Sequence, residues 1–192
     1  IVDVFGADHM DAYPDVLAVI EALGYDKNKV KVLIHQFVTL IKKGKPVKMS
    51  TRKAQYVTLN DLIDEIGSDV VRYFFIMRGM NTHLNFDIDL AKDESDANPV
   101  YYLQYAHARL CNIINHAHSQ GHNIDKQTSL EPLKLNSEMQ LIKTVMEFPD
   151  IIDKAHENLE PQAIANYLQS LAGQFHRYYS KERIVTHNQE QT

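Results

Sequence analysis

Apolar and polar residues follow one pattern before about residue 58 and another after it. In the first part, short apolar runs at 1–5 and 30–34 flank a helical stretch at 11–23 that ends at Gly24. A helix between two short apolar runs predicts strand, helix and strand. Beyond residue 58 the apolar positions recur mostly at helical spacing. The pattern therefore predicts an α/β fold that becomes mostly α.

Local signals set the limits of the helices in the second part. Thr58, with Asp61 three residues later, predicts a capped helix that ends at Gly67, and Ser68 is expected to cap the next one. Asn98 followed by Pro99 predicts the start of a long helix that runs to about Ser119. A polar connection at 120–135 precedes three further helical patterns, near 139–148, 151–155 and 161–179. We expect these helices to form a bundle.

Composition allows one or two soluble domains and adds two expectations. The chain has 192 residues, of which 44% are hydrophobic, and a net charge of −5. We expect neither a membrane span nor a signal peptide, and the single cysteine fits the reducing cytoplasm. The acidic balance argues against a general nucleic-acid binder, although a local basic patch is still compatible with RNA. Because Ile1 lies inside an apolar run, we also expect the natural protein to have residues upstream.

The segment around Val47, Lys48, Met49 and Ser50 is the strongest candidate for chemistry. Six basic residues and no acidic ones lie between positions 42 and 53. Residues 42–45 are predicted to form a turn between extended segments at 37–40 and 46–47. Such a concentration of positive charge suits a polyphosphate. A basic turn can also be only a solvated hairpin, and both interpretations stay open from the residues alone.

A second candidate lies at the end of the first predicted strand. Gly6 follows that strand directly, and Asp8 and His9 come next. In open α/β sheets, ligands bind at the carboxyl ends of the strands, which would place these residues at a binding edge. The alternative is a helix cap beside a surface histidine.

Other residues with possible chemistry favour structural roles. Asp87 and Asp89 are expected to cap a helix and form salt bridges instead of binding a metal. The histidines at 116, 118 and 122 have poor spacing for zinc, so we predict no metal site. Cys111 falls within the apolar pattern of the long helix and is expected to be buried and unreactive.

Several motifs together resemble one family. The run Lys48-Met-Ser-Thr-Arg-Lys-Ala-Gln-Tyr-Val-Thr-Leu59, the segment Gly6-Ala-Asp-His9 and the run Asn98-Pro-Val-Tyr-Tyr-Leu-Gln-Tyr-Ala-His-Ala-Arg109 occur in the order found in arginyl-tRNA synthetase. Together with 61–67, 71–75 and 84–90, they follow one another in that order between residues 6 and 109. The chain thus resembles this class I aminoacyl-tRNA synthetase, from the C-terminal part of the catalytic domain into the helical anticodon-binding domain.

The resemblance implies a domain division and an activity. Residues 1–57 would be the second half of a Rossmann-like nucleotide domain with its signature loop, 58–97 a helical connector, and 98–192 a truncated anticodon-binding domain. The parent enzyme would join arginine to ATP, with Mg²⁺, and release pyrophosphate. It would then pass the arginyl group from the adenylate to its tRNA. Gln104, His107 and Arg109 would either support the junction between the domains or contact tRNA.

The resemblance also assigns the site residues. Lys48, Ser50 and Arg52 would be catalytic through their contacts with phosphate, and Val47 and Met49 would bracket adenine. Gly6, Asp8 and His9 would contact ATP or the aminoacyl-adenylate. Lysine charge near the leaving pyrophosphate would stabilise the transition state more than the ground state.

Two departures from the family pattern limit these assignments. Thr51 stands where many class I enzymes have a second lysine, and no His-x-Gly-His sequence occurs in the chain. We therefore expect the chain alone to be inactive without an N-terminal catalytic half. Another class I enzyme, such as the cysteinyl enzyme, and a non-catalytic helical RNA-binding module stay open as alternatives.

Overall fold

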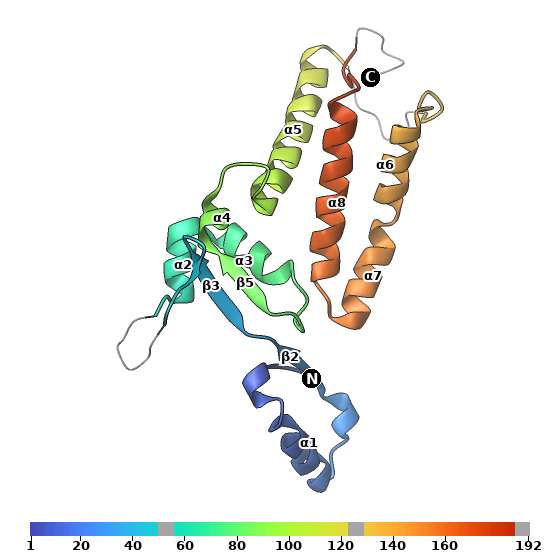
Figure 1. Cartoon of the computed structure of the whole chain (residues 1–192). Coiled ribbons are helices and arrows are strands. Elements are labelled where there is room, and N and C mark those ends of the chain that lie inside the picture. The colour runs from blue at the N-terminus through green and yellow to red at the C-terminus, as the bar shows by residue number, and fades with distance from the viewer. Residues whose placement is uncertain (50–55, 123–128, 187–192) are drawn as a thin grey trace. The chain divides into compact units, whose positions relative to one another are not determined.

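The chain forms two compact units, Ile1–Lys92 and Asp93–Thr192. The structure is a computed structural model that describes residues 1–49, 56–122 and 129–186. All strands of the described residues lie in the first unit, and the second unit is built from helices (Figure 1). The change from mixed α/β to mostly helical structure is therefore confirmed. The finer division at 57/58 and 97/98 stays a prediction.

The first unit begins with a strand, helix and strand in the predicted order. Strand β1 (Val2–Gly6) pairs in parallel with β2 (Lys31–His35), and α1 (Tyr13–Ala22) lies between them in sequence. Short 3₁₀ turns, η1 (Ala7–His9) and η2 (Lys27–Lys29), flank the helix. No residue of 1–36 is buried, and α1 exposes apolar side chains such as Val19 and Leu23.

A second sheet has the strand order β4-β3-β5. Strand β3 (Val38–Lys42) pairs antiparallel with β4 (Lys45–Pro46) and parallel with β5 (Leu84–Asp87). Between β3 and β4, Lys43 and Gly44 have φ of 54° and 70°. Positive φ at both central residues is the geometry of the two-residue hairpin turn that matches strand twist. The predicted turn in the basic segment is confirmed.

Three helices pack with this sheet and form the core of the first unit. They are α2 (Leu59–Ile66), α3 (Ser68–Ile76) and α4 (Ile88–Lys92). Phe74, Phe86 and Ile88 are the largest fully buried side chains. The Phe74 and Phe86 rings lie 5.3 Å apart, within the range of favourable aromatic pairs. The core therefore lies next to β3, the strand that leads into the basic hairpin.

The expected cap at Ser68 is wrong. Gly67 occupies the N-cap position of α3, and Ser68 is the first helical residue, without a side-chain capping bond from the N-cap. Gly67 also ends α2, and its φ of 88° is one that glycine adopts without steric cost. One glycine thus serves both helix ends, which moves the start of α3 one residue earlier.

The second unit contains α5 (Pro99–Ser119), α6 (Asn136–Met146), α7 (Phe148–Asn158) and α8 (Gln162–Tyr179). Helix α8 contacts each of the other three and lies between α5 and the α6–α7 pair (Figure 1). Ala106, Ala172 and Phe175 form the buried cluster where α5 meets α8. The predicted bundle is present in these described helices. None of the helices in the described ranges has both the length and the apolarity to cross a bilayer.

Only part of α5 is buried. Val100, Ala106 and Ala117 are buried, but Leu110 and Cys111 are exposed. At 3.6 residues per turn, position 111 lies about 140° around the helix from Ala106, on nearly the opposite face. The burial expected for Cys111 is therefore wrong: its sulfur lies 3.8 Å from Nε2 of His107, one turn earlier.

Candidate functional site

The segment with the predicted phosphate-binding residues leaves the sheet from a fixed position. The Val47 amide donates to the Leu40 carbonyl at 2.8 Å, and Leu40 is a core residue of β3. Lys48 and Met49 follow and are exposed. The backbone therefore holds Val47 while the Lys48 side chain can reach a ligand. Ser50 and Arg52, the other two predicted catalytic residues, lie outside the described residues.

The same segment returns to the fold at a capped helix. Thr58 Oγ1 accepts from the Asp61 amide at 3.1 Å, and the Asp61 carboxylate accepts from the Thr58 amide at 2.8 Å. This reciprocal pair is the predicted capping box and is confirmed. Hydrogen bonds from Thr58 hold the pKa of Asp61 below its usual value, because they favour the ionised carboxylate.

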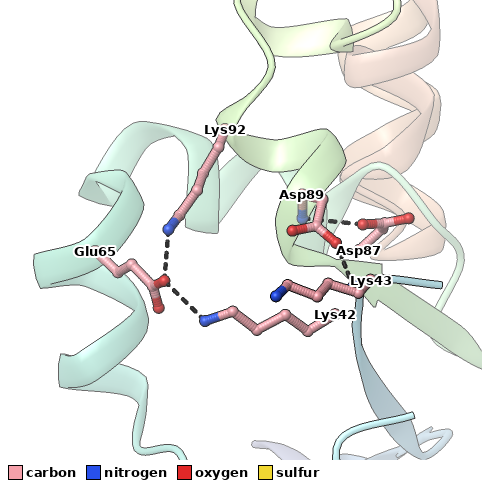
Figure 2. Close-up of polar contacts among 6 residues, drawn as sticks. All are labelled: Lys42, Lys43, Glu65, Asp87, Asp89 and Lys92. Atoms are coloured by element: carbon pink, nitrogen blue, oxygen red, sulfur yellow. Dashed lines mark hydrogen bonds and ion pairs between the residues drawn. The ribbon is translucent and has the colours of Figure 1, made fainter. Parts of the chain in front are cut away.

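Positive charge is concentrated on the hairpin before Lys48. Lys42, Lys43 and Lys45 are all exposed. Lys42 Nζ lies 3.2 Å from Glu65 Oε1 on α2, and the Lys43 amide donates to the Asp89 carboxylate on α4 (Figure 2). These contacts hold the turn of the hairpin against two helices. They join residues that are far apart in sequence, and no sequence signal indicated them.

Asp87 and Asp89 have structural partners at the start of α4. Asp87 Oδ1 accepts from the amides of Asp89 and Leu90 at 3.0 and 3.1 Å, which caps the helix. The predicted capping role is confirmed. The expected salt bridges are absent among the described residues, where Asp89 accepts a backbone amide instead. Within the described ranges, no group of three His, Cys, Asp or Glu side chains could hold a metal ion.

The second predicted site lies at the carboxyl edge of the parallel pair. Gly6 ends β1 and lies in register with His35 at the end of β2. Asp8 and His9 follow in η1, with Oδ2 and Nε2 3.6 Å apart and both side chains more than half exposed. Asp8 makes no cap bond to this turn, since the N-cap residue is Gly6. Both polar side chains are therefore accessible at the edge where a ligand would bind.

His35 at this edge was not predicted. Its Nδ1 donates to the Gln36 carbonyl at 2.7 Å, so in the neutral ring Nε2 is the acceptor. A histidine at the end of a predicted strand could have been proposed from the same strand-end argument as Gly6. Among the residues that the structure describes, no hydrogen bond or ion pair joins Gly6, Asp8 or His9 to Val47, Lys48 or Met49. The two predicted sites are thus observed as separate groups.

The helical unit contains a basic and aromatic pocket of about 740 Å³ between α5 and the end of α8. The Arg109 guanidinium lies over the Tyr105 and Tyr179 rings, 4.4 and 4.9 Å from their centroids. Arg109 also donates to His176 Nδ1 at 3.1 Å. Arginine therefore links α5 to α8 and lines the pocket, together with Lys181 and Arg183 beyond the end of α8.

Sequence comparison relates the chain to known proteins. Residues 103–192 match the DALR anticodon binding domain. The arginine–tRNA ligase of Salinibacter ruber is 49% identical over 98% of this chain and 34% of the relative. That of Desulfotalea psychrophila is 48% identical over 99% of this chain and 35% of the relative. The chain spans about a third of the length of these curated relatives.

Solved structures give a consistent result. A Campylobacter jejuni protein provisionally assigned as an arginyl-tRNA synthetase is 34% identical, with a TM-score of 0.86 over 99% of this chain and 41% of that one. Thermus thermophilus arginyl-tRNA synthetase has a TM-score of 0.74 over 95% of this chain and 33% of that one. At 19% identity, the second comparison shows the fold alone.

Proposed function

We propose that this chain belongs to the arginyl-tRNA synthetase family, because it matches arginine–tRNA ligases over almost its whole length. The protein that contains it joins arginine to the AMP part of ATP, with Mg²⁺, and releases pyrophosphate. It then transfers the arginyl group from the adenylate to tRNA and releases AMP. The chain supplies the second half of a Rossmann-like catalytic domain, and an N-terminal half completes the site. We also propose that the protein works in the cytoplasm.

The observation that carries the proposal is the placement of Lys48. It directly follows a residue whose amide is bonded to the sheet core, and it lies beside a hairpin with three exposed lysines. A phosphate-binding cation needs a backbone that is held in place and a side chain that solvent and ligand can reach. The backbone before Lys48 is held at Val47, and the Lys48 side chain is exposed. Negative charge grows on the leaving pyrophosphate during adenylation, so a cation held there lowers the barrier. Ser50 and Arg52 would add a hydroxyl donor and further charge to the same phosphates.

The adenylate is proposed to lie along the β1–β2 edge. Gly6 lets the backbone approach a ligand closely, and the exposed Asp8 and His9 side chains can bond ribose or amino groups. Val47 and Met49 would bracket adenine through backbone contacts. The exposed apolar side chains of α1 are consistent with a further part of the catalytic domain packing there.

The helical unit is proposed to bind the tRNA for arginine. The match to an anticodon-binding domain supports this role, and so does the cationic pocket at the end of α8. Tyrosine rings can stack on unpaired bases while arginine and lysine contact phosphates. Arg109 supports the α5–α8 contact through His176, and a single side chain can serve both that role and RNA binding.

Pyrophosphate exchange with different amino acids tests the activity in the full-length enzyme that contains this chain. We expect exchange that depends on arginine and not on cysteine. Cysteine-dependent exchange would favour the cysteinyl alternative. Salt-sensitive tRNA binding without exchange by any amino acid would favour the non-catalytic RNA-binding module. The chain alone should show no exchange, because the groups that orient arginine against ATP come from both halves of the site.

A further inference from the structure

One carboxylate, that of Glu65, is shared by lysines from two other elements. Glu65 Oε1 lies 3.2 Å from Lys42 Nζ on β3 and 2.5 Å from Lys92 Nζ on α4 (Figure 2). The three side chains are 32–47% exposed. The ion-paired triad Lys42–Glu65–Lys92 thus joins α2, β3 and α4 through one oxygen. We refer to it as the Glu65 clamp.

The clamp connects the two elements that flank the segment 47–58, which contains Lys48. That segment leaves the hairpin after Pro46 and joins α2 at Leu59, and Glu65 is in the last turn of α2. Lys42 pairs with Lys45 in the β3–β4 ladder, so the position of Lys42 fixes that of β4. The clamp therefore sets the position of the hairpin relative to the helix that begins at the other end.

Lys48 depends on this hairpin for its position. The Val47 amide bonds to Leu40, and Leu40 and Lys42 are two residues apart, so their side chains lie on the same face of β3. Leu40 is buried in the core, and Lys42 extends to Glu65 at the end of the same face. The Lys43 amide bond to Asp89 holds the hairpin turn from a second side. A shift of the hairpin would therefore move the backbone at Lys48 as well.

We propose that Glu65 is a positioning residue for adenylation, which holds the β3–β4 hairpin so that Lys48 meets the phosphates of ATP. This inference rests on the proposed function. Glu65 acts through Lys42 and Lys92 and does not touch substrate. The dependence of rate on position is steep, because a displacement of about 1 Å at a reacting group can cost about 100-fold. A single carboxylate shared by two cations also holds two helices and a strand at once.

The test is Glu65→Gln in the full-length enzyme, with Asp64→Asn as the matched control. Both changes remove one negative charge from α2, but Asp64 has no ion pair among those of the described residues. We expect Glu65→Gln to lower kcat for arginine-dependent pyrophosphate exchange by about 10- to 100-fold. The KM for arginine should change by less than about twofold, and Asp64→Asn should have no effect on either constant.

Three further variants and hydrogen exchange distinguish positioning from loss of folding. Lys42→Gln should lower kcat, and adding it to Glu65→Gln should cause little further loss, because both remove the same contact. Hydrogen exchange at the Val47 amide should rise in Glu65→Gln while exchange in the α3 core stays unchanged. Unchanged kcat in Glu65→Gln, with kcat lost in Lys48→Ala, would overturn the clamp alone. Unchanged kcat in both would contradict the proposed function instead.

Discussion

Replacement of Asn98 by alanine should destabilise the helical unit more than loss of an ordinary helix cap. Asn98 is 3% exposed, and its Oδ1 accepts from the Val100 amide at 3.0 Å. Its Nδ2 donates to the Asp93 carbonyl at 2.9 Å, so one side chain serves the helix start and the chain before it. Loss of the cap costs about 1 kcal/mol. Loss of the second bond costs about 1 kcal/mol more.

We therefore expect Asn98→Ala to lower the free energy of unfolding by about 2 kcal/mol. Asn98→Ser is the matched control, because serine keeps a capping oxygen, lacks the amide donor and adds no charge. It should cost about half as much. Urea unfolding followed by far-UV circular dichroism measures both values. A loss below about 0.5 kcal/mol for alanine would contradict a structural role for the Asn98 side chain, since that is the range of ordinary surface substitutions. Equal losses in the two variants would refute the separate contribution of the cap.

Three further predictions concern other contacts. Hydrogen bonds from Lys92 and Lys42 lower the pKa of Glu65 from its usual 4.5. The stability that Glu65 adds should therefore be complete above pH 4.5 and be lost as the pH falls through the lowered pKa. Unfolding free energies of Glu65→Gln and wild type, measured against pH, should become equal below that pKa. Gly6→Ala would place a β-carbon against the Asp8 carboxylate and force that side chain to move. The affinity for an adenylate analogue, measured by calorimetry, should fall about tenfold. Adding Asp8→Ala to Gly6→Ala should lower the affinity little further, because both changes remove the same contact. Tyr167→Phe removes a buried 3.0 Å bond to the Thr144 carbonyl and should cost about 1 kcal/mol in urea unfolding, unlike the same change at an exposed tyrosine.

Local signals predicted the parts of the fold that depend on neighbouring residues. The Thr58–Asp61 capping box, the Asn98 cap and the hairpin turn each depend on residues at most three positions apart. Such contacts form within one helical turn or one hairpin, so sequence spacing determines them. The start of α3 was misplaced because Gly67 can serve both adjoining helix ends.

Contacts between distant residues could not be predicted in this way. Glu65 lies 23 and 27 positions from its two lysines, and Arg109 lies 67 positions from His176. Their pairing depends on how the helices and strands pack, and periodicity alone does not determine that. Exposure of Cys111 was missed for a different reason. At 3.6 residues per turn Cys111 lies about 140° around α5 from the buried Ala106, so helical spacing alone places it away from that face.

The candidate site was predicted in part. The sequence placed Gly6, Asp8 and His9 at a strand end and Lys48 beside a hairpin, and the structure has them there. Their roles toward ATP come from family resemblance, and they stay predictions. The chemistry of a site depends on residues from several helices and strands. A sequence motif can therefore identify some of these residues while the others come from distant parts of the chain.

The most direct test of the account is the effect of Lys48→Ala on arginine-dependent pyrophosphate exchange in the full-length enzyme. Lys29→Ala is the matched control, because it removes one exposed lysine of the same unit away from the hairpin. We predict that Lys48→Ala lowers kcat by at least about 100-fold, with an unchanged KM for arginine, as expected for a group that stabilises transition-state charge. A Lys48→Ala enzyme as active as Lys29→Ala would contradict the assignment of this segment to ATP chemistry.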